Sequence, residues 1–336
     1  MRLSDFDYEL PEELIAQEPP PERDGARMLV LHRAEQRMED RLFRDLPEFL
    51  HAGDCLVLND SRVMPSRLFG HREKSAGAIE VMLLEPVNAD GRDWRALVRP
   101  GRKVRLGTVV RFDNDFSATV VEHGERGERI VRFPAGIDVY AALDRLGHLP
   151  LPPYIRRGES PRDRERYQTV FARERGSVAA PTAGLHFTPE VIGRCEAAGA
   201  NVARVTLHVG LGTFQPVDRE DFENHQLHYE RYAIGVEARS AIEAAQRVVA
   251  VGTTSVRTLE SAARTGAAEG VTNLFLYPGA GFQKVGAMLT NFHLPRTSLL
   301  LLVCAFAGTD FAMAAYHHAV EQKYRFFSYG DCMLIL

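Results

Sequence analysis

The sequence has few cysteines and no long hydrophobic run, and both absences narrow the class of protein. Its 336 residues include four cysteines, at Cys55, Cys195, Cys304 and Cys332, with no Cys-x-x-Cys pair. Scattered cysteines predict buried free thiols in a reducing compartment rather than a disulfide framework. The longest strongly apolar stretch, 298–307, is shorter than the roughly 20 residues that cross a bilayer. The N-terminus lacks the apolar core of a signal peptide, so we expect a cytoplasmic protein with no membrane partner.

Two familiar cofactor signatures are also missing. The pair Gly210-x-Gly212 lacks the third glycine of a dinucleotide-binding loop, and Pro216 prevents a helix from following directly. The glycine-rich signature of class I methyltransferases is absent too. His225-x-x-His228 has no third ligand at familiar zinc spacing. We therefore expect neither a metal nor a prosthetic group, although a metal-dependent hydrolase built on the histidines remains an alternative.

Positive charge is gathered in two segments of a chain whose net charge is −4. Residues 92–111 carry seven Lys or Arg against one acid, and residues 156–175 carry seven Arg against four acids. One such run is typical of a solvated face, but two on one chain favour a polyanionic partner. A non-catalytic RNA-binding protein is the second alternative.

Strand and helix patterns predict a layered α/β domain interrupted by an antiparallel β-barrel. Residues 28–32 and 55–58 are typical of buried strands, and we expect helices over 11–17 and 42–50. Between residues 67 and 150 the segments become short and alternate polar with apolar residues, which favours a small barrel. We therefore assign residues 1–66 and 151–336 to a discontinuous α/β domain, and 67–150 to the inserted barrel.

The second α/β segment alternates helices with strands. We expect helices over 190–198, 238–246, 256–264, 298–307 and 311–324. The expected strands are 201–209, 247–251, 273–277 and the tail 331–336. At least one of Phe326 and Phe327 should be buried.

Four polar segments in this half are typical of ligand-binding loops. They are 181–188 (PTAGLHFT), 208–214 (HVGLGTF), 252–257 (GTTSVR) and 290–295 (TNFHLP). Glycine, hydroxyl and imidazole groups at strand ends are how an α/β scaffold builds a pocket. Taken singly, each feature has a plainer explanation: Thr254 or Ser255 could merely cap a helix, and a lone histidine is more often structural.

Together these segments make the chain resemble one family, the S-adenosylmethionine:tRNA ribosyltransferase-isomerases of queuosine biosynthesis. The similarity runs nearly end to end, through 14–17 (LIAQ), 59–62 (NDSR), 167–169 (YQT), the four polar segments and 324–331 (YRFFSYGD). Tyr229 stands where the family usually has serine, so no role of that serine carries over. Residues 280–282 (AGF) are also unusual after Tyr-Pro-Gly.

The resemblance implies transfer of the ribosyl moiety of S-adenosylmethionine, the co-substrate, to 7-aminomethyl-7-deazaguanine at the wobble position of a tRNA with a GUN anticodon. The product would be epoxyqueuosine, with adenine and methionine released, and we expect the enzyme to be a monomer. Base and acid candidates are His186 and His208. Residues expected to bind S-adenosylmethionine or the base are Thr182, Gly184, Gly210, Gly212, Thr213, Thr253, Thr254, Arg257, Asn291 and His293. Residues expected to contact tRNA phosphates are Arg99, Arg102, Lys103, Arg105, Arg156 and Arg157.

Overall fold

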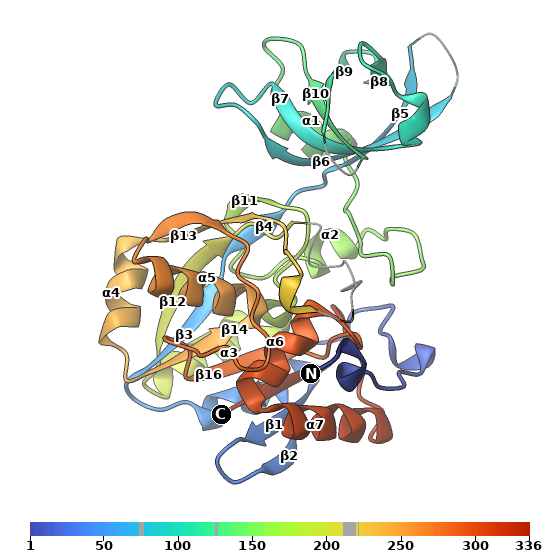
Figure 1. Cartoon of the computed structure of the whole chain (residues 1–336). Helices are drawn as coiled ribbons and strands as arrows, with labels where there is room; N and C mark the ends of the chain where they lie inside the picture. The colour runs from blue at the N-terminus through green and yellow to red at the C-terminus, as the bar shows by residue number, and fades with distance from the viewer. Residues whose placement is uncertain (74–76, 125–126, 211–219, 221) are drawn as a thin grey trace.

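The chain forms a large α/β layer structure with a separate barrel at one end (Figure 1). The computed structural model describes residues 1–73, 77–124, 127–210, 220 and 222–336. The predicted fold class, an α/β domain carrying an inserted antiparallel barrel, is confirmed. The barrel strands lie inside the segment 67–150 that we assign to the insertion.

A mixed sheet forms the centre of the α/β part, with strand order β15-β13-β12-β3-β14-β16-β17-β1-β2. Its strands are β1 (Arg27–His32), β2 (Arg37–Leu42), β3 (Asp54–Asn59), β12 (Asn201–Leu207), β13 (Glu230–Ile234), β14 (Arg247–Val251), β15 (Glu269–Thr272), β16 (Ala287–Asn291) and β17 (Cys332–Ile335). Neighbours among β12, β3, β14 and β16 pair in parallel. The carboxyl ends of these four strands therefore meet at one edge of the sheet.

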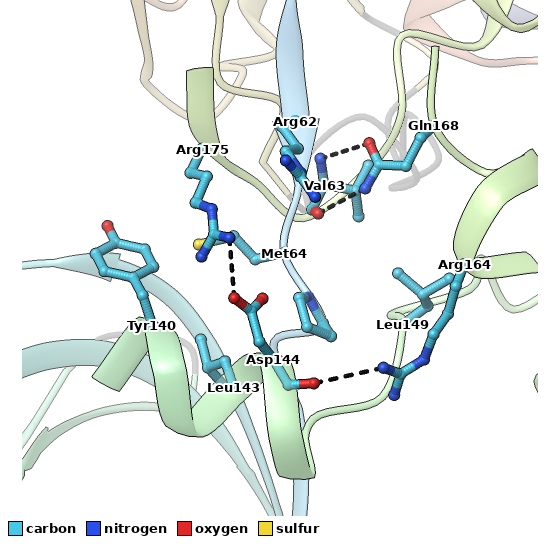
Figure 2. Close-up of a pocket in the computed structure, with 11 residues that line it drawn as sticks. Arg62, Val63, Met64, Tyr140, Leu143, Asp144, Leu149, Arg164, Gln168 and Arg175 are labelled. Carbon is cyan, nitrogen blue, oxygen red and sulfur yellow. Dashed lines mark hydrogen bonds and ion pairs between the residues drawn. The ribbon is translucent and has the colours of Figure 1, made fainter. Parts of the chain in front are cut away.

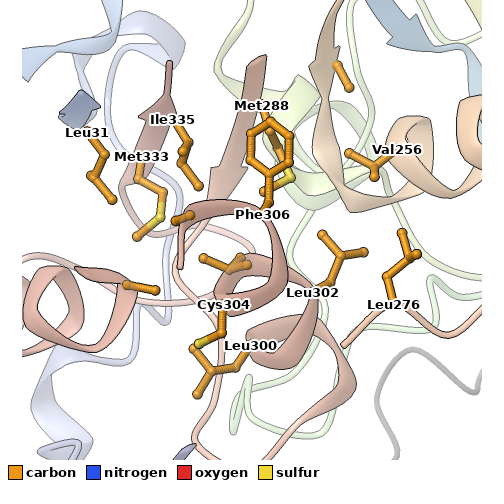
Figure 3. Packing of buried hydrophobic residues seen from close by; sticks show 14 of the residues in the cluster. Leu31, Val256, Leu276, Met288, Leu300, Leu302, Cys304, Phe306, Met333 and Ile335 are labelled. Carbon is orange, nitrogen blue, oxygen red and sulfur yellow. The ribbon is translucent and has the colours of Figure 1, made fainter. Parts of the chain in front are cut away.

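The central strands are buried on both faces because helices cover each side. In β1, Leu29 and Leu31 pack into one core while Met28 and Val30 pack into the other. The first core contains residues of α4 (Val236–Ala244), α5 (Gly252–Thr265), α6 (Ser298–Ala307) and α7 (Thr309–Glu321). Figure 3 shows Leu300, Leu302 and Phe306 of this core beside Met288. The second core contains residues of α3 (Pro189–Ala197) and of the 3₁₀ helix η4 (Phe43–Phe49).

The barrel is closed, with strand order β10-β7-β6-β5-β8-β9. Its strands are β5 (Arg67–Arg72), β6 (Ala78–Pro86), β7 (Asp93–Arg99), β8 (Val109–Asp113), β9 (Phe116–His123) and β10 (Glu128–Arg132), followed by the helix α1 (Val139–Leu146). Alternate residues fill its interior: Trp94, Ala96 and Val98 of β7 are buried. The intervening residues of β7 therefore point outward.

Entry to the barrel and exit from it lie side by side. The backbone N–H of Arg67 donates to the carbonyl of His148 (3.1 Å), and the N–H of His148 donates back (2.8 Å). A short ladder of β4 (Ser61–Val63) with β11 (Glu174–Ser177) follows on the α/β side. Figure 2 shows Arg175 reaching Asp144 of α1 at 2.9 Å, while Arg164 bonds carbonyls at the end of α1. The helix α2 (Asp163–Arg166) carries Arg164.

Most of the predicted helices and strands are confirmed. The predicted helix at 11–17 is wrong, whereas the predicted helix at 42–50 is present as a 3₁₀ helix rather than an α-helix. Residues 11–17 form only a short 3₁₀ turn, Glu12–Leu14, because Ile15 and Ala16 extend to pair with Phe326. Residues 42–50 form the 3₁₀ helix η4, which contains Pro47. Proline lacks the N–H that an α-helix would need there.

The predicted strand 273–277 is also wrong. This apolar segment is a connection whose Leu276 packs into the first core. Its hydrophobic character reflects that packing rather than strand pairing. Conversely, β2 escaped prediction because it is an exposed, charged edge strand. The four cysteines are buried free thiols, as predicted.

Within the part of the chain that the structure describes, no single helix is long and apolar enough to cross a membrane. The pair α6 and α7 meets that criterion only together, with a bend of 117° between them.

Candidate functional site

A cavity of about 290 Å³ opens at the carboxyl edge of the parallel strands. We call it the sheet-edge cavity. Its lining includes residues of all four polar segments, together with Tyr154, Arg156 and Phe327: Ala180–Ala183, Val209, Gly252–Thr254 and Asn291–Leu294. Open α/β sheets bind ligands in crevices outside the carboxyl ends of their strands. The strand order therefore explains why segments more than a hundred residues apart converge here.

Gly252 makes the sharp turn between β14 and α5 that brings hydroxyl groups to the cavity. Its φ of +85° lies in the left-handed region, which glycine adopts without the steric cost of a side chain. The helix α5 begins at Gly252 itself, four residues earlier than predicted, and neither Thr254 nor Ser255 caps it. Ser255 Oγ instead donates to the carbonyl of Val251 (2.7 Å).

Thr254 presents an unpaired hydroxyl at the cavity. Its Oγ1 is buried, and no hydrogen-bond partner for it lies among the described residues. Thr182 and Thr253 also line the cavity. A buried hydroxyl without a partner carries a desolvation cost that a ligand would relieve. Thr254 is therefore the clearest ligand-binding candidate of its segment.

Gly184 is not among the residues that line the cavity. A Cβ added there would lie 2.8 Å from Thr169 Cγ2 and 2.9 Å from Phe171 Cζ. Its lack of a side chain permits close packing of the segment in which Thr182 lies, and its predicted ligand contact stays a prediction.

Asn291 and His293 both line the sheet-edge cavity at the end of β16. The side-chain amide of Asn291 donates to the carbonyl of Phe327 (2.9 Å), whereas its Oδ1 has no hydrogen-bond partner among the described residues. His293 Nε2 lies 2.8 Å from Thr290 Oγ1. Burial lowers the pKa of His293 to about 3, so the imidazole is neutral at pH 7.

His186 lies behind the cavity wall rather than in it. The ring is buried against Phe43, with ring centroids 5.2 Å apart. Burial lowers its pKa to about 4, against the opposing influence of the nearby Asn291 side chain. His186 is thus neutral at pH 7 and adjoins the cavity through Asn291.

Two aromatic rings complete the cavity. Tyr154 and Phe327 stack with centroids 4.2 Å apart and an interplanar angle of 27°. Phe327 has a φ of +71°, an unusual conformation for a bulky residue and one found where function or packing demands it. Phe326 and Phe327 are both buried, as expected for at least one of them. Sequence reasoning missed Tyr154, whose only signal was its place after a proline-rich connector.

A second cavity, of about 510 Å³, lies between the barrel and the sheet. We call it the junction cavity. Its barrel side comprises Leu84, Glu85, Arg95, Leu97 and Glu128. Its sheet side includes Gly176, Val178, His208–Gly210 and 226–231. The two catalytic candidates are therefore at different places, since His208 lines this cavity and His186 adjoins the other.

His208 packs directly over Gly176. A Cβ at position 176 would lie 2.6 Å from His208 Nδ1, so only glycine leaves room for the ring. Nδ1 is buried and has no hydrogen-bond partner among the described residues. Burial and then Arg231 lower the pKa of His208, while Glu174 opposes them. A neutral imidazole results at pH 7, able to accept a proton.

Arg257 makes a buried ion pair with Glu230 instead of lining the sheet-edge cavity. Its Nε also donates to the carbonyl of Leu274 (3.1 Å). Glu230 Oε1 in turn accepts from the backbone N–H of Gly210 (2.7 Å). The pair thereby orients the start of the glycine segment. Gly212 and Thr213 lie outside the described residues.

The predicted phosphate-binding residues fall into two groups. Arg99, Arg102 and Arg105 are exposed on the barrel, and within the described residues none makes an ion pair. The side chain of Lys103 lies outside the described part. In contrast, Arg156 pairs with Glu12 (2.8 Å), and Arg157 binds buried Asp163 through two bonds of 2.6 and 2.8 Å.

No group of three or more His, Cys, Asp or Glu side chains in the described residues is arranged to hold a metal ion. His225 packs edge-on against Phe275, with ring centroids 5.6 Å apart. His228 lines the junction cavity.

Comparisons with known proteins agree along the whole chain. Residues 3–335 match the family model described as queuosine biosynthesis protein. Proteins named S-adenosylmethionine:tRNA ribosyltransferase-isomerase are similar in Solibacter usitatus (65% identity) and Symbiobacterium thermophilum (53%), each match covering 100% of both chains. A crystal structure titled S-adenosylmethionine tRNA ribosyltransferase from Thermotoga maritima is 42% identical with a TM-score of 0.57, covering 99% of this chain and 100% of that one. The chain belongs to the queuosine biosynthesis protein family.

Proposed function

We propose that this protein is an S-adenosylmethionine:tRNA ribosyltransferase-isomerase. It transfers the ribosyl moiety of S-adenosylmethionine to 7-aminomethyl-7-deazaguanine at the wobble position of a tRNA with a GUN anticodon. The product is epoxyqueuosine, and adenine and methionine are released. The observation that carries the proposal is the match to relatives of that name over the full chain.

The sheet-edge cavity is the proposed binding site for S-adenosylmethionine. Its volume of about 290 Å³ lies near the lower end of the range for small-molecule sites. The stacked rings of Tyr154 and Phe327 offer an apolar wall for adenine. Thr254 Oγ1 and Asn291 Oδ1 offer unpaired polar atoms for ribose hydroxyls or adenine N–H groups.

The pKa values of the histidines define which proton transfers they can perform. The sulfonium acidifies the neighbouring C5′ protons, and a neutral imidazole can accept one of them. Burial keeps His186 and His208 neutral at pH 7 by lowering their pKa values, so each ring has a nitrogen lone pair, and we propose both as proton acceptors. His186 would act beside Asn291, and His208 would take the proton that the incoming aminomethyl group must lose. Leaving adenine is stabilised by a hydrogen-bond donor. The hydroxyl of Tyr154, which lies 2.5 Å from Ser328 Oγ, stays protonated because burial raises its pKa. Tyr154 is thus a proposed hydrogen-bond donor to the leaving group.

Adenine release from S-adenosylmethionine tests the activity directly. Purified protein is incubated with S-adenosylmethionine and tRNA carrying the 7-deazaguanine precursor, and adenine is quantified by chromatography. We expect adenine in equal amounts to modified tRNA, and none without the RNA. Release that is absent under all conditions would refute the transferase function. Single-turnover rates of His186→Ala and His208→Ala test the acid–base roles, which are wrong if both variants keep near-normal rates.

A pair of threonines on α5 tests the location of the binding site. Thr254→Val removes a hydroxyl that no described residue bonds, whereas Thr258→Val removes one that donates to the carbonyl of Thr254 (3.0 Å) outside the cavity. If the ligand uses Thr254, its loss should raise the KM for S-adenosylmethionine about tenfold, equivalent to about 1.4 kcal/mol. Thr258→Val should leave that KM unchanged. Equal effects of both changes would place the ligand elsewhere.

The barrel arginines are the proposed tRNA-binding surface. Arg99, Arg102 and Arg105 are exposed without ion pairs among the described residues, so their charges are available to phosphates, and we include Lys103 with them. Arg156 has an exposed partner, Glu12, and an exposed ion pair is weak enough to exchange for a phosphate. Asp163 occupies the two terminal nitrogens of Arg157, whose Nε donates to the carbonyl of Gln17 (3.0 Å). Arg157 is therefore the least available of the predicted phosphate contacts.

Salt dependence of tRNA binding tests this surface. Replacing Arg99, Arg102 and Arg105 with glutamine should weaken binding and reduce the slope of log K against log salt by about 1 per lost contact. Arg95→Gln is unsuitable as a control because Arg95 lines the junction cavity. Arg145→Gln serves instead, since Arg145 is exposed but paired with Asp113 (2.7 Å). An unchanged slope in the triple variant would eliminate the barrel surface.

We further propose that the enzyme acts in the cytoplasm as a monomer, without a resident metal or prosthetic group. Sedimentation of the purified protein tests the monomer. Activity that survives exhaustive chelation would separate the transferase from a metal-dependent hydrolase, and adenine release separates it from a non-catalytic RNA-binding protein.

A further inference from the structure

The two cavities meet at one residue. Val209 lines both the sheet-edge cavity and the junction cavity. We propose that the junction cavity receives the acceptor base, an extruded purine bearing an aminomethyl group, while S-adenosylmethionine occupies the sheet-edge cavity. This placement rests on the proposed function, and it brings the acceptor amine and the donor ribose together around Val209.

The dimensions and lining of the junction cavity suit an extruded nucleotide. At about 510 Å³ it is a mid-range ligand site. Enzymes that modify a base place it in such a pocket, hold its faces between apolar side chains and bond its edge. Leu84, Leu97 and Val178 supply apolar surface, and Glu85, Glu128 and Arg95 supply hydrogen-bonding groups.

The barrel carboxylates match the donor-rich edge of a guanine-type base. Such a base presents adjacent N–H and NH₂ groups, for which a carboxylate is the natural acceptor. Arg95 lies between Glu128 (3.2 Å) and Glu85 (3.4 Å), and Arg231 also reaches Glu85 (3.7 Å), so Glu85 has two cationic partners. Glu230 already binds Arg257 and the N–H of Gly210. Glu128 is therefore our choice for the residue that bonds the base.

His208 supplies the group that the amine requires. An alkylamine is cationic at pH 7 and cannot attack until it loses a proton. The imidazole of His208 lines the same cavity, and its buried Nδ1 lacks a hydrogen-bond partner among the described residues. A proton passing from the ammonium to this ring would leave a neutral amine and an imidazolium, which balances the step.

Strand β7 links this cavity to the tRNA-binding surface. Its outward-facing residues are Arg95 and Leu97, which line the cavity, and then Arg99, an exposed cation. Alternate residues of a strand are about 7 Å apart. RNA whose backbone meets Arg99 thus lies close to the cavity into which its base would turn.

Leu97→Trp provides the test, because it fills the cavity from outside the barrel core. Binding is measured by fluorescence anisotropy with two anticodon stem-loop RNAs that differ only in carrying 7-aminomethyl-7-deazaguanine or guanine at the wobble position. Calorimetry measures S-adenosylmethionine binding. Val121→Trp is the matched control, since Val121 also lies at an outward-facing position of the barrel and lines neither cavity. Glu128→Gln is a second variant with no added bulk, and thermal unfolding verifies that all three fold.

We expect the wild-type protein and Val121→Trp to prefer the aminomethyl RNA by at least tenfold. Leu97→Trp should bind the two RNAs with equal affinity, whereas Glu128→Gln should weaken the binding of both, because guanine presents the same N–H and NH₂ edge. The affinity of each variant for S-adenosylmethionine should stay within twofold of the wild type. If Leu97→Trp retains the full preference, Glu128→Gln binds both RNAs as tightly as the wild type and the wild type releases adenine, the acceptor placement is overturned and the transferase function stands. If the wild type releases no adenine with the aminomethyl RNA, both the proposed function and the placement of the acceptor base are refuted.

Discussion

The buried imidazole of His186 should make the α/β part sensitive to mild acid. In the folded protein its pKa is about 4, against an ordinary value of 6.5 in the unfolded chain. Between these two pH values the unfolded state binds more protons, so the free energy of unfolding falls as the pH falls. At pH 5 the loss due to this one ring amounts to about 2 kcal/mol, and at pH 7.5 it is about zero.

His186→Gln isolates this contribution, because glutamine is polar but does not titrate. Both proteins should lose stability between pH 7.5 and pH 5. We expect the decrease in the free energy of unfolding to be about 2 kcal/mol smaller in the variant than in the wild type. Burial also lowers the pKa of His293. Because His293 is present in both proteins, its contribution to the pH dependence of stability cancels in the comparison. His71→Gln is the control, because His71 is exposed on the barrel and its replacement should leave the drop unchanged.

The assay is urea unfolding at each pH, followed by circular dichroism at 222 nm. Tryptophan fluorescence is unsuitable, since the single tryptophan is Trp94, inside the barrel, and reports on the wrong part of the molecule. If the wild type and His186→Gln lose equal stability between the two pH values, His186 is not held neutral by burial.

Three further changes probe the ion pair and the aromatic wall. Arg257→Ala leaves Glu230 buried without its cation, and we expect it to lower the free energy of unfolding by about 3–5 kcal/mol; a loss below about 1 kcal/mol in urea titrations would show that the pair is weak. Phe327→Leu removes one ring of the stack with Tyr154. Aromatic stacking on a base contributes about 1–3 kcal/mol. Calorimetry should therefore find that S-adenosylmethionine binds between about fivefold and more than a hundredfold more weakly. Tyr154→Phe keeps the stack, so it should preserve that affinity while slowing adenine release; weaker binding in this variant would argue against the assigned roles.

The sequence was most informative where a residue's neighbours in the chain decide its conformation. The central strands were predicted because runs such as 55–58 are apolar throughout, and the barrel because polar and apolar residues alternate. Prediction was wrong at residues 11–17 and 273–277, where contacts with distant segments override the local pattern. No local pattern reveals that Ile15 pairs with Phe326.

The difference between local sequence patterns and contacts with distant segments also applies to the candidate site. The polar segments could be recognised from their residue types, but the grouping of their side chains depends on strand order. Sequence alone could not separate His186 from His208, or show Arg257 turned toward Glu230. Tyr154 and Glu128 carried no specific signal in the sequence, since a tyrosine after prolines and a glutamate in a barrel strand are both commonplace. They acquire meaning only from the cavities that they line.

The paired entry and exit of the barrel bear on how the chain folds. Arg67 and His148 exchange backbone hydrogen bonds. In a folded barrel, the points where the chain enters and leaves would therefore lie next to each other. The α/β part would then close a short turn instead of a loop of about 80 residues, a difference of about 2–3 kcal/mol in closure entropy. A barrel that folds first would thus shorten the effective loop between β3 or β4 and the strands, a hundred or more residues later in the chain, with which they pair. The pairing of these strands would then be faster. By the same reasoning, a two-residue turn could replace the whole insertion. We expect the resulting α/β protein to fold and to bind S-adenosylmethionine, but to bind RNA weakly or not at all.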